Sequence, residues 1–222
     1  MDNKSWYSVE AKSDSAEVLI YNEIGRNGIT SADFAKDLAA IKSKEIVVRL
    51  NTPGGSVFDG MAIYNSLKSH PARIVAKIDG LAASIGSVIA MAADEIQIAK
   101  NAHMMIHNAS MEVYGNSKDL RSAADFTEKM SMAIATTYAD RTKQPIDQIQ
   151  SWMNEETWMN ADEAINSGFA DKITDSVKLT NVFDLSQFKR TPSAIISAAV
   201  SDVVKDLEST IQPTPTESPT LN

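Results

Sequence analysis

The amino-acid sequence predicts an α/β domain with a largely parallel β-sheet. Short β-rich runs alternate along the chain with segments of helical periodicity, which is typical of successive βα units. The run "EIVVRLN" (45–51) is almost continuously apolar, as expected of a strand that is covered on both faces. A length of 222 residues with 43% hydrophobic content is enough for one domain with a sizeable core.

The first part of the chain contains three expected strands and two expected helices. The strands are "EVLIY" (17–21), "EIVVRLN" (45–51) and "RIVAKID" (73–79). A helix is predicted over 30–42, because Thr30 can cap it and Phe34, Leu38 and Ile41 fall on one face. The glycine loop "NTPGGSVFDG" (51–60) leads into a second helix over 61–70, and an apolar helix is expected after Ser84.

The second part continues the alternation. Strands are expected at 95–99 and 103–108, and "MEVYG" (111–115) is short and β-like. A long helix is predicted from Ser117 to about Arg141, with a weak apolar stripe. Pro145 suits the first turn of another helix, and Gly168 suits the end of a short helix over 161–167. "FADKI" (169–173) then returns to a strand.

The chain divides by composition into three parts. Residues 1–16 form a polar N-terminal segment, and residues 17–185 form the predicted domain. Residues 186–222 form an extension, in which 192–208 has the pattern of an amphipathic helix. The Pro/Ser/Thr-rich stretch 209–222 is predicted to be disordered.

Composition and charge exclude several classes of function. The net charge of −8 and the absence of a basic patch argue against nucleic-acid binding. The absence of cysteine excludes disulfides, zinc–thiolate sites and a thiol nucleophile. Only three histidines (His70, His103 and His107) are present, and we expect no metal and no cofactor. The start of the chain lacks the features of a signal peptide, and no apolar run reaches about 18 residues, so we expect a cytoplasmic protein without a membrane partner.

One serine stands where a strand turns into a buried helix, in "KIDGLAASIGSVIAMAADE" (77–95). Ser84 there is either a helix N-cap or a nucleophile. As a nucleophile it would lie in positive potential at the helix start. The N–H of Ile85 would then be one donor to an oxyanion, and the glycine loop of a neighbouring strand could supply a second.

Two further motifs carry the same kind of ambiguity. "NTPGGS" (51–56) is either a βα turn or a loop that exposes backbone N–H groups, and it lacks the phosphate-binding patterns. His107, at the end of "HMMIHN" (103–108), is either a structural residue or a general base. As a base it must come within about 3 Å of the Ser84 hydroxyl, and it would also need an acid on its other ring nitrogen.

Four segments occur in order at spacings that resemble the Clp peptidase family of serine proteases. They are "NTPGGSVFDGMAIYNSL", "IDGLAASIGSVIAMA", "MMIHNAS" and "ETWMNADEAINSGFADKI", and the resemblance covers residues 17 to 175. It is most like the bacteriophage branch of Clp-related head maturation proteases. The resemblance implies a ClpP/crotonase-like spiral of stacked βαβ units with a long handle helix. "MEVYG" and the helix from Ser117 match the handle through which such subunits form and stack rings.

The resemblance also implies roles for individual residues. Ser84 matches the nucleophile and His107 the general base, while Gly55 and Ile85 match the two backbone donors of the oxyanion hole.

The third member of the triad departs from the family pattern. The family has an aspartate where this chain has Glu156, and the neighbouring Glu155 and the later Asp171 are alternatives. The segment "NASMEVYG" lacks the Pro and paired Gly that are usual after the histidine, so a differently shaped substrate groove is expected. The N-terminal pore loops of the housekeeping enzymes are also hard to recognise here.

The function that this resemblance implies is a serine endopeptidase that cleaves polypeptides through an acyl-enzyme. The leading hypothesis is processing of capsid or scaffold proteins in phage head maturation, in the host cytoplasm or procapsid. An alternative is a proteolytic subunit that works with an ATP-dependent unfoldase. Less favoured alternatives are a crotonase-type acyl-CoA enzyme and an inactive ring scaffold.

A homo-oligomeric ring is expected, with stacked heptamers as one arrangement. The extension from residue 186 is either a docking segment for the assembling shell or a disordered terminus.

Overall fold

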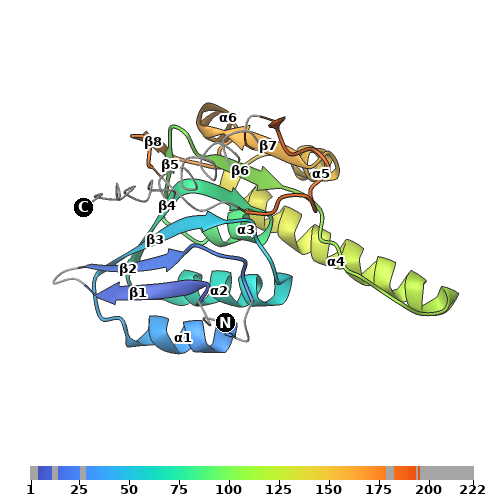
Figure 1. The fold of residues 1–222 in the computed structure, drawn as a ribbon, viewed down its shortest axis with the longest axis horizontal. Helices are drawn as coiled ribbons and strands as arrows, with labels where there is room; N and C mark the ends of the chain where they lie inside the picture. The colour runs from blue at the N-terminus through green and yellow to red at the C-terminus, as the bar shows by residue number, and fades with distance from the viewer. Residues whose placement is uncertain (1–4, 12–14, 26–28, 179–182, 194, 196–222) are drawn as a thin grey trace, which may run out of the picture.

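A computed structural model of the chain describes residues 5–11, 15–25, 29–178, 183–193 and 195 (Figure 1). Within these residues eight strands and six helices alternate. They are β1 (Tyr7–Ala11), β2 (Ser15–Ile20), α1 (Ser31–Ala40), β3 (Glu45–Thr52), α2 (Val57–Ser69), β4 (Arg73–Ala83), α3 (Ile85–Ala90), β5 (Glu95–Ala99), β6 (His103–Ile106), α4 (Ser117–Thr142), α5 (Ile146–Asn154), β7 (Thr157–Asn160), α6 (Ala161–Asn166) and β8 (Lys172–Thr174).

The strands form one sheet that is parallel through its centre. The order is β1-β2-β3-β4-β5-β8, and all pairings from β2 to β8 in this series are parallel. β1 is antiparallel to β2, and β7 is antiparallel to β6. The largely parallel α/β architecture predicted from the sequence is therefore confirmed.

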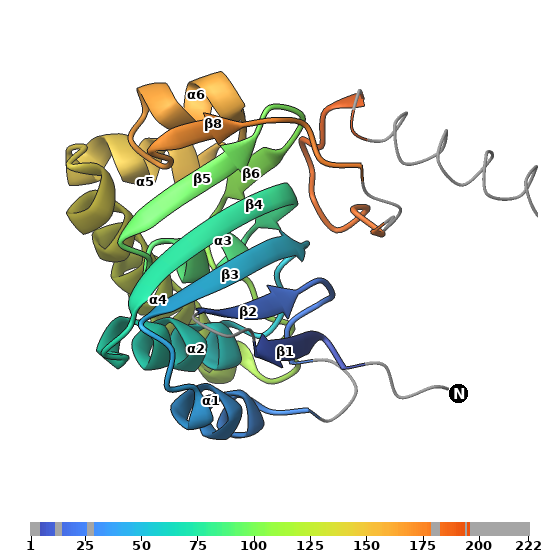
Figure 2. The same cartoon turned by 90° about the vertical axis from the view of Figure 1, so that its left-hand side faces the viewer.

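The long strand β4 changes partner along its length. Its first part, Val75 to Ile78, pairs with β5, whereas its last part, Leu81 to Ala83, pairs with β6. The sheet therefore divides at β4, with β5 and β6 on successive stretches of the same edge (Figure 2). This division brings the ends of β4 and β6 together.

The core lies between the sheet and the helices. In β2 every second residue is buried, whereas β3 is buried at six of its eight positions, as expected of a strand that is covered on both faces. The predicted capping of α1 is confirmed, because Thr30 and Asp33 form a capping box and Phe34 and Leu38 are buried. Helix α2 begins at Val57, four residues earlier than predicted, because Ser56 accepts a hydrogen bond from the backbone of Asp59.

The sheet also contains residues of the predicted N-terminal segment. β1 pairs with β2, and Trp6 is buried, with its indole nitrogen donating to the carbonyl of Ile29 at 2.9 Å. The indole stacks on Phe34 of α1 at a centroid distance of 5.9 Å. These contacts make residues 6 to 11 part of the fold.

One predicted strand is wrong. Residues 111–115 form no strand, and Met111, Val113 and Tyr114 are exposed. Among the described residues no strand lies against this segment to complete a ladder, and a β-like sequence without a partner does not form a strand.

Helix α4 extends well beyond the body of the molecule (Figure 1). Only its C-terminal half packs on the core, through Ile134, Ala135 and Tyr138, while Leu120 and Phe126 in its first half are exposed.

No helix in the described part of the chain is both long enough and apolar enough to cross a membrane. The helix predicted over 192–208 lies, beyond residue 195, outside the described residues, as does the predicted disorder of 209–222.

A partly buried ion pair joins β3 to β4. The guanidinium of Arg49 donates two hydrogen bonds of 2.8 Å to the carboxylate of Asp79, which is 3% exposed. The hydroxyl of Tyr21 lies 2.5 Å from the same carboxylate, and burial followed by this contact raises the pKa of Tyr21 to about 12. The pair fixes the sheet just before β4 reaches the candidate site.

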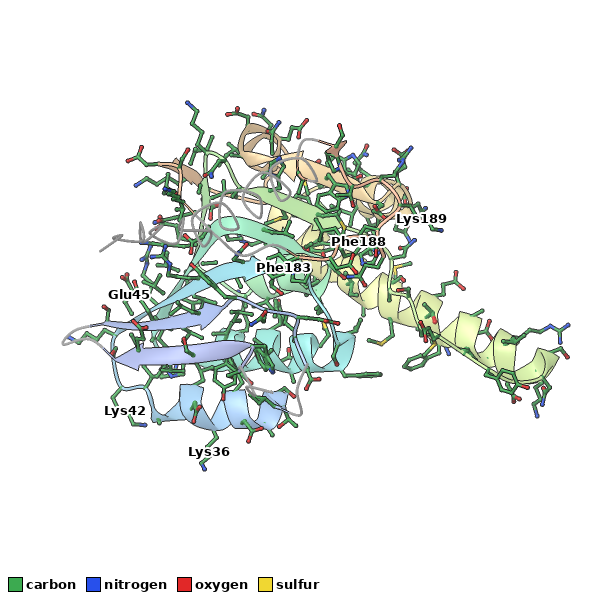
Figure 3. All side chains as sticks on the ribbon, viewed as in Figure 1. Lys36, Lys42, Glu45, Phe183, Phe188 and Lys189 are labelled. Carbon is green, nitrogen blue, oxygen red and sulfur yellow. The ribbon has the colours of Figure 1, made fainter. Side chains whose placement is uncertain are left out.

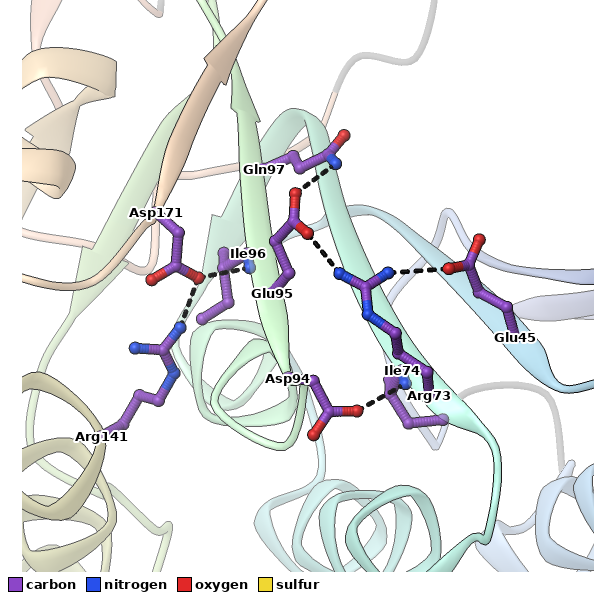
Figure 4. Close-up of polar contacts among 9 residues, drawn as sticks. All are labelled: Glu45, Arg73, Ile74, Asp94, Glu95, Ile96, Gln97, Arg141 and Asp171. Atoms are coloured by element: carbon purple, nitrogen blue, oxygen red, sulfur yellow. Dashed lines mark hydrogen bonds and ion pairs between the residues drawn. The ribbon is translucent and has the colours of Figure 1, made fainter.

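We predict that Asp79→Ala destabilises the protein by about 3 kcal/mol, because it leaves the Arg49 guanidinium without its carboxylate in a partly buried position. The matched control is Arg73→Ala. Arg73 bridges Glu45 and Glu95 at the protein surface (Figure 4), and its loss is expected to change stability by about 1 kcal/mol or less. Urea unfolding monitored by circular dichroism measures both, and equal effects would contradict this ranking.

Candidate active site

Ser84 occupies the turn between β4 and α3. Its backbone has φ 55° and ψ −128°, in the left-handed region that a residue with a Cβ rarely adopts. Such a conformation costs about 1–3 kcal/mol and persists only where the surroundings hold it. Here the Ser84 amide donates to the carbonyl of Met105 on β6 at 2.9 Å. Ser84 stands at the N-cap position, but its side chain makes no capping hydrogen bond. The N-cap alternative from the sequence is therefore wrong.

The Ser84 side chain instead contacts His107. Its hydroxyl oxygen lies 2.7 Å from Nε2 of His107, the residue that follows β6. The pairing of β4 with β6 produces this contact, because Ala83 is opposite Met105 and both strands end at the same edge. A serine hydroxyl at this distance from an imidazole nitrogen can pass its proton to the ring and attack an electrophile.

A buried polar network lies beneath the serine. The hydroxyl of Ser87 on α3 is 2.6 Å from the carbonyl oxygen of Ser84 and 2.7 Å from the hydroxyl of Tyr138 on α4. Tyr138 is completely buried, and this burial raises the pKa of its phenol. The network joins two helices to the backbone of Ser84. The sequence offered no signal for it beyond the helical spacing of Tyr138.

The glycine loop approaches the serine closely. Gly54 and Gly55 have positive φ angles of 100° and 136°. A Cβ on Gly54 would lie 2.7 Å from the Cβ of Ser84, so glycine is required for this approach. Gly55 forms a parallel bridge with Ile24, which uses the carbonyl of Gly54 and the amide of Ser56. The amide of Gly55 is not used by this bridge.

A small cavity of about 80 Å³ lies beside the reactive pair. Its lining includes Ser84, Ile85, His107 and Gly55, so both residues that are predicted to supply backbone donors border the space beside Ser84. Backbone N–H groups around such a cavity are suited to hold the oxygen of a tetrahedral intermediate.

Burial controls the protonation of His107. It lowers the pKa of the imidazole below the ordinary value of 6.5, and the negative charge of Glu156 opposes this shift. The ring is therefore neutral near pH 7, and a neutral ring is able to accept the serine proton.

Glu156 lies near His107 but is bound elsewhere. Its carboxylate accepts hydrogen bonds from the backbone N–H groups of Lys189 and Arg190, at 2.9 and 2.6 Å, and from the Trp158 indole at 3.3 Å. Burial raises its pKa, but these hydrogen bonds outweigh burial and hold the pKa below its ordinary value. Within the described residues no hydrogen bond joins Glu156 to His107. The structure therefore brings Ser84 and His107 into contact but leaves the third carboxylate separate.

The two alternative carboxylates have other partners. Glu155 is exposed and pairs with Arg190 at 3.6 Å. Asp171 accepts from the backbone of Ile96 at 2.7 Å and pairs with Arg141 at 2.5 Å (Figure 4). Ile96 is paired with the first part of β4, whereas Ser84 follows its end, so Asp171 is at the wrong end of the sheet. Glu156 is the one carboxylate of the three whose charge acts on His107.

The described residues include no cluster of three or more His, Cys, Asp or Glu side chains arranged to hold a metal ion.

Two residues of the site were not predicted from the sequence. Gln187 and Phe188 border the cavity beside Ser84, although nothing in "DLSQFKR" (184–190) indicates that these residues lie there.

The chain is similar in sequence to known Clp proteases. The profile described as "Clp protease" matches residues 2–177. The "ATP-dependent Clp protease proteolytic subunit 3" of Rhodococcus jostii is 34% identical over 140 residues, which cover 62% of this chain and 69% of the relative. The "ATP-dependent Clp protease proteolytic subunit 1" of Leifsonia xyli is 33% identical over 145 residues, which cover 64% of this chain and 74% of the relative.

A solved structure agrees with these sequence matches. A variant of ClpP1 from Listeria monocytogenes has a TM-score of 0.65 and 25% sequence identity, and the match covers 72% of this chain and 91% of that chain. The similarity supports the ClpP-like spiral and the long helix expected from the sequence.

We predict that the reaction of Ser84 with a fluorophosphonate slows as the pH falls through a midpoint below 6.5. Below its pKa the imidazole of His107 is protonated and cannot accept the serine proton. Glu156→Gln should move the midpoint to lower pH still, since the carboxylate charge favours the protonated ring. Glu155→Gln serves as the matched control and should leave it unchanged. A wild-type midpoint at or above 6.5, or equal midpoints in all three proteins, would contradict this assignment.

Proposed function

The chain belongs to the Clp protease family, and from this premise we propose that Ser84 and His107 cleave peptide bonds through an acyl-enzyme. Clp proteases are serine peptidases, so this chain is a serine-type endopeptidase by family. In the proposed reaction the hydroxyl oxygen of Ser84 attacks the peptide carbonyl carbon while Nε2 of His107 takes the hydroxyl proton. The N–H groups of Gly55 and Ile85 stabilise the resulting oxyanion.

The same two side chains complete the cycle. The protonated His107 gives its proton to the leaving amine, and the carbonyl group remains bound to Ser84 as an ester. A water molecule then attacks the ester with His107 again as the base, which releases the acid product and restores the serine. No proton is lost or gained over the whole cycle apart from those of the water that is consumed.

The observation that carries this proposal is the 2.7 Å contact between the Ser84 hydroxyl and the His107 ring. It occurs at a serine with a left-handed backbone that makes no capping hydrogen bond. A purely structural serine would gain by capping its helix, and this one is instead directed at a base. A crotonase-type acyl-CoA enzyme would not need such a contact.

We assign the third role to Glu156. Its position just before "TWMNADEA" (157–164) matches the acid of the family, and its charge favours the protonated state of His107. In the working state its carboxylate would accept a hydrogen bond from Nδ1 of His107 and orient the ring. In the structure the carboxylate is bound to the backbone groups of residues 189 and 190 and makes no hydrogen bond to His107, so this contact requires the Glu156 side chain to move.

The substrate and partners are proposed from the relatives. Both named relatives are ATP-dependent Clp protease proteolytic subunits. These names favour the alternative from the sequence, in which this chain degrades polypeptides with an ATP-driven unfoldase, over capsid or scaffold processing in a phage. We further propose a homo-oligomeric ring. The extended α4, with Leu120, Phe126 and Met132 exposed, supports a role in contacts between copies.

We predict that Ser84→Ala lowers the hydrolysis of an unfolded protein by at least about 10⁴-fold, because the nucleophile is lost. The matched control is Ser69→Ala at the exposed end of α2, which should retain full activity. Release of fluorescent peptides from a quenched casein measures both. Equal rates in the wild type and Ser84→Ala would contradict the proposed nucleophile, and an inactive but assembled wild type would favour the scaffold hypothesis.

The same assay separates the two proposed biological roles. A folded, tagged protein should be degraded only when ATP and a Clp-type unfoldase are added. Cleavage of a capsid or scaffold protein at a few sites without an unfoldase would instead support head maturation.

A further inference from the structure

The chain returns to the active site after the last strand. Residues 183–191, here called the C-terminal strap, pack beside β6 and β7, where Figure 3 labels Phe183, Phe188 and Lys189. Phe183, Leu185 and Phe188 pack into a small apolar cluster separate from the main core. The other members of this cluster come from β4, β6 and β7: Leu81, Ala83, Met105 and Trp158.

One ring of the C-terminal strap contacts the proposed base directly. The ring of Phe188 stands edge-on to the imidazole of His107, with centroids 5.5 Å apart and an angle of 90°. Phe188 also packs edge-on against Trp158 at 5.8 Å, and only 8% of its surface is exposed. The ring therefore covers one side of His107 and limits access to it.

The backbone of the C-terminal strap binds the proposed third member of the triad. Lys189 donates to Oε2 of Glu156, and Arg190 donates to Oε1, which also accepts from the Trp158 indole. To orient His107 the same carboxylate must accept from Nδ1, but within the described residues no hydrogen bond joins Glu156 to His107. The strap therefore holds the carboxylate in a position in which it does not orient the ring.

We propose that the C-terminal strap is an inhibitory cover that must release Glu156 before this carboxylate can orient His107. The inference rests on the proposed peptidase function. The cover is held by two backbone hydrogen bonds to Glu156, by the Arg190 guanidinium on the carbonyl of Glu155 at 2.8 Å, and by the small apolar cluster. Local opening of such a segment is easier than unfolding of the domain. Activity then scales with the fraction of molecules in which the cover is open.

The test uses three variants of the full chain. Arg190→Pro removes the N–H group that donates to Glu156 at 2.6 Å as well as the side chain, whereas Arg190→Ala keeps the N–H group and removes only the exposed side chain with its bond to the Glu155 carbonyl. Phe188→Ala removes the ring that packs on His107. We expect the rate constant for fluorophosphonate labelling of Ser84 to rise roughly tenfold in Arg190→Pro and in Phe188→Ala. Arg190→Ala should stay within about twofold of the wild type.

Unchanged or slower labelling of Arg190→Pro and Phe188→Ala, with the wild type reactive, would overturn the proposal and make the strap a supporting part of the site. A second measurement does not depend on activity. In Arg190→Pro, but not in Arg190→Ala, NMR of the protein with ¹⁵N-labelled histidine should show the far-downfield Nδ1 proton of a histidine–carboxylate hydrogen bond. If no protein is labelled, the proposed peptidase function fails, and this signal still decides whether the strap withholds Glu156. Its absence from Arg190→Pro would overturn the proposal.

Discussion

The change of partner along β4 is the constraint on which the site depends. A parallel strand ends at the same edge of the sheet as its neighbours, but β5 ends short of the edge that β4 reaches. The last three residues of β4 pair instead with β6, and the two residues that follow these strands are brought within reach of each other. The 2.7 Å contact between Ser84 and His107 is a direct consequence of this register. A shift of one residue would turn the His107 side chain to the other face.

The rest of the molecule holds that contact in place. The positive φ of Ser84 is unfavourable, and it is maintained by the pairing with Met105, by the wholly buried α3 and by the hydroxyls of Ser87 and Tyr138. The absence of a side chain on Gly54 allows the loop after β3 to touch the same turn. Core packing is thus linked to the candidate active site, because α3 and α4 contact both the core and the turn at Ser84. This packing stabilises the strained backbone that holds the serine hydroxyl beside His107.

Local patterns made much of this predictable from the sequence. The strand before Ser84, the glycine loop and the strand before His107 are each visible in short runs of residues, and the family resemblance put them in register. The N-terminal strand was not visible, because a five-residue strand beside a polar segment has little periodicity, and only the partnership with β2 defines it. Residues 111–115 have a strand-like composition but no partner strand in the described part of the chain, so their composition predicted a strand that does not form. The partners of Glu156 were also beyond reach. They are backbone N–H groups of residues more than thirty positions later in the chain. Since nearly every residue has a backbone N–H group, the sequence does not indicate which of them binds Glu156.

The measurement that tests the central claim most directly is the location of a covalent adduct. The full-length protein would be treated with a fluorophosphonate, digested, and mapped by tandem mass spectrometry beside His107→Ala. We expect one adduct in the wild type, on Ser84, and almost none in the variant, since the serine depends on the imidazole for activation. An adduct on another serine, or an equal yield on Ser84 without the imidazole, would contradict the assignment of Ser84 and His107 as nucleophile and base.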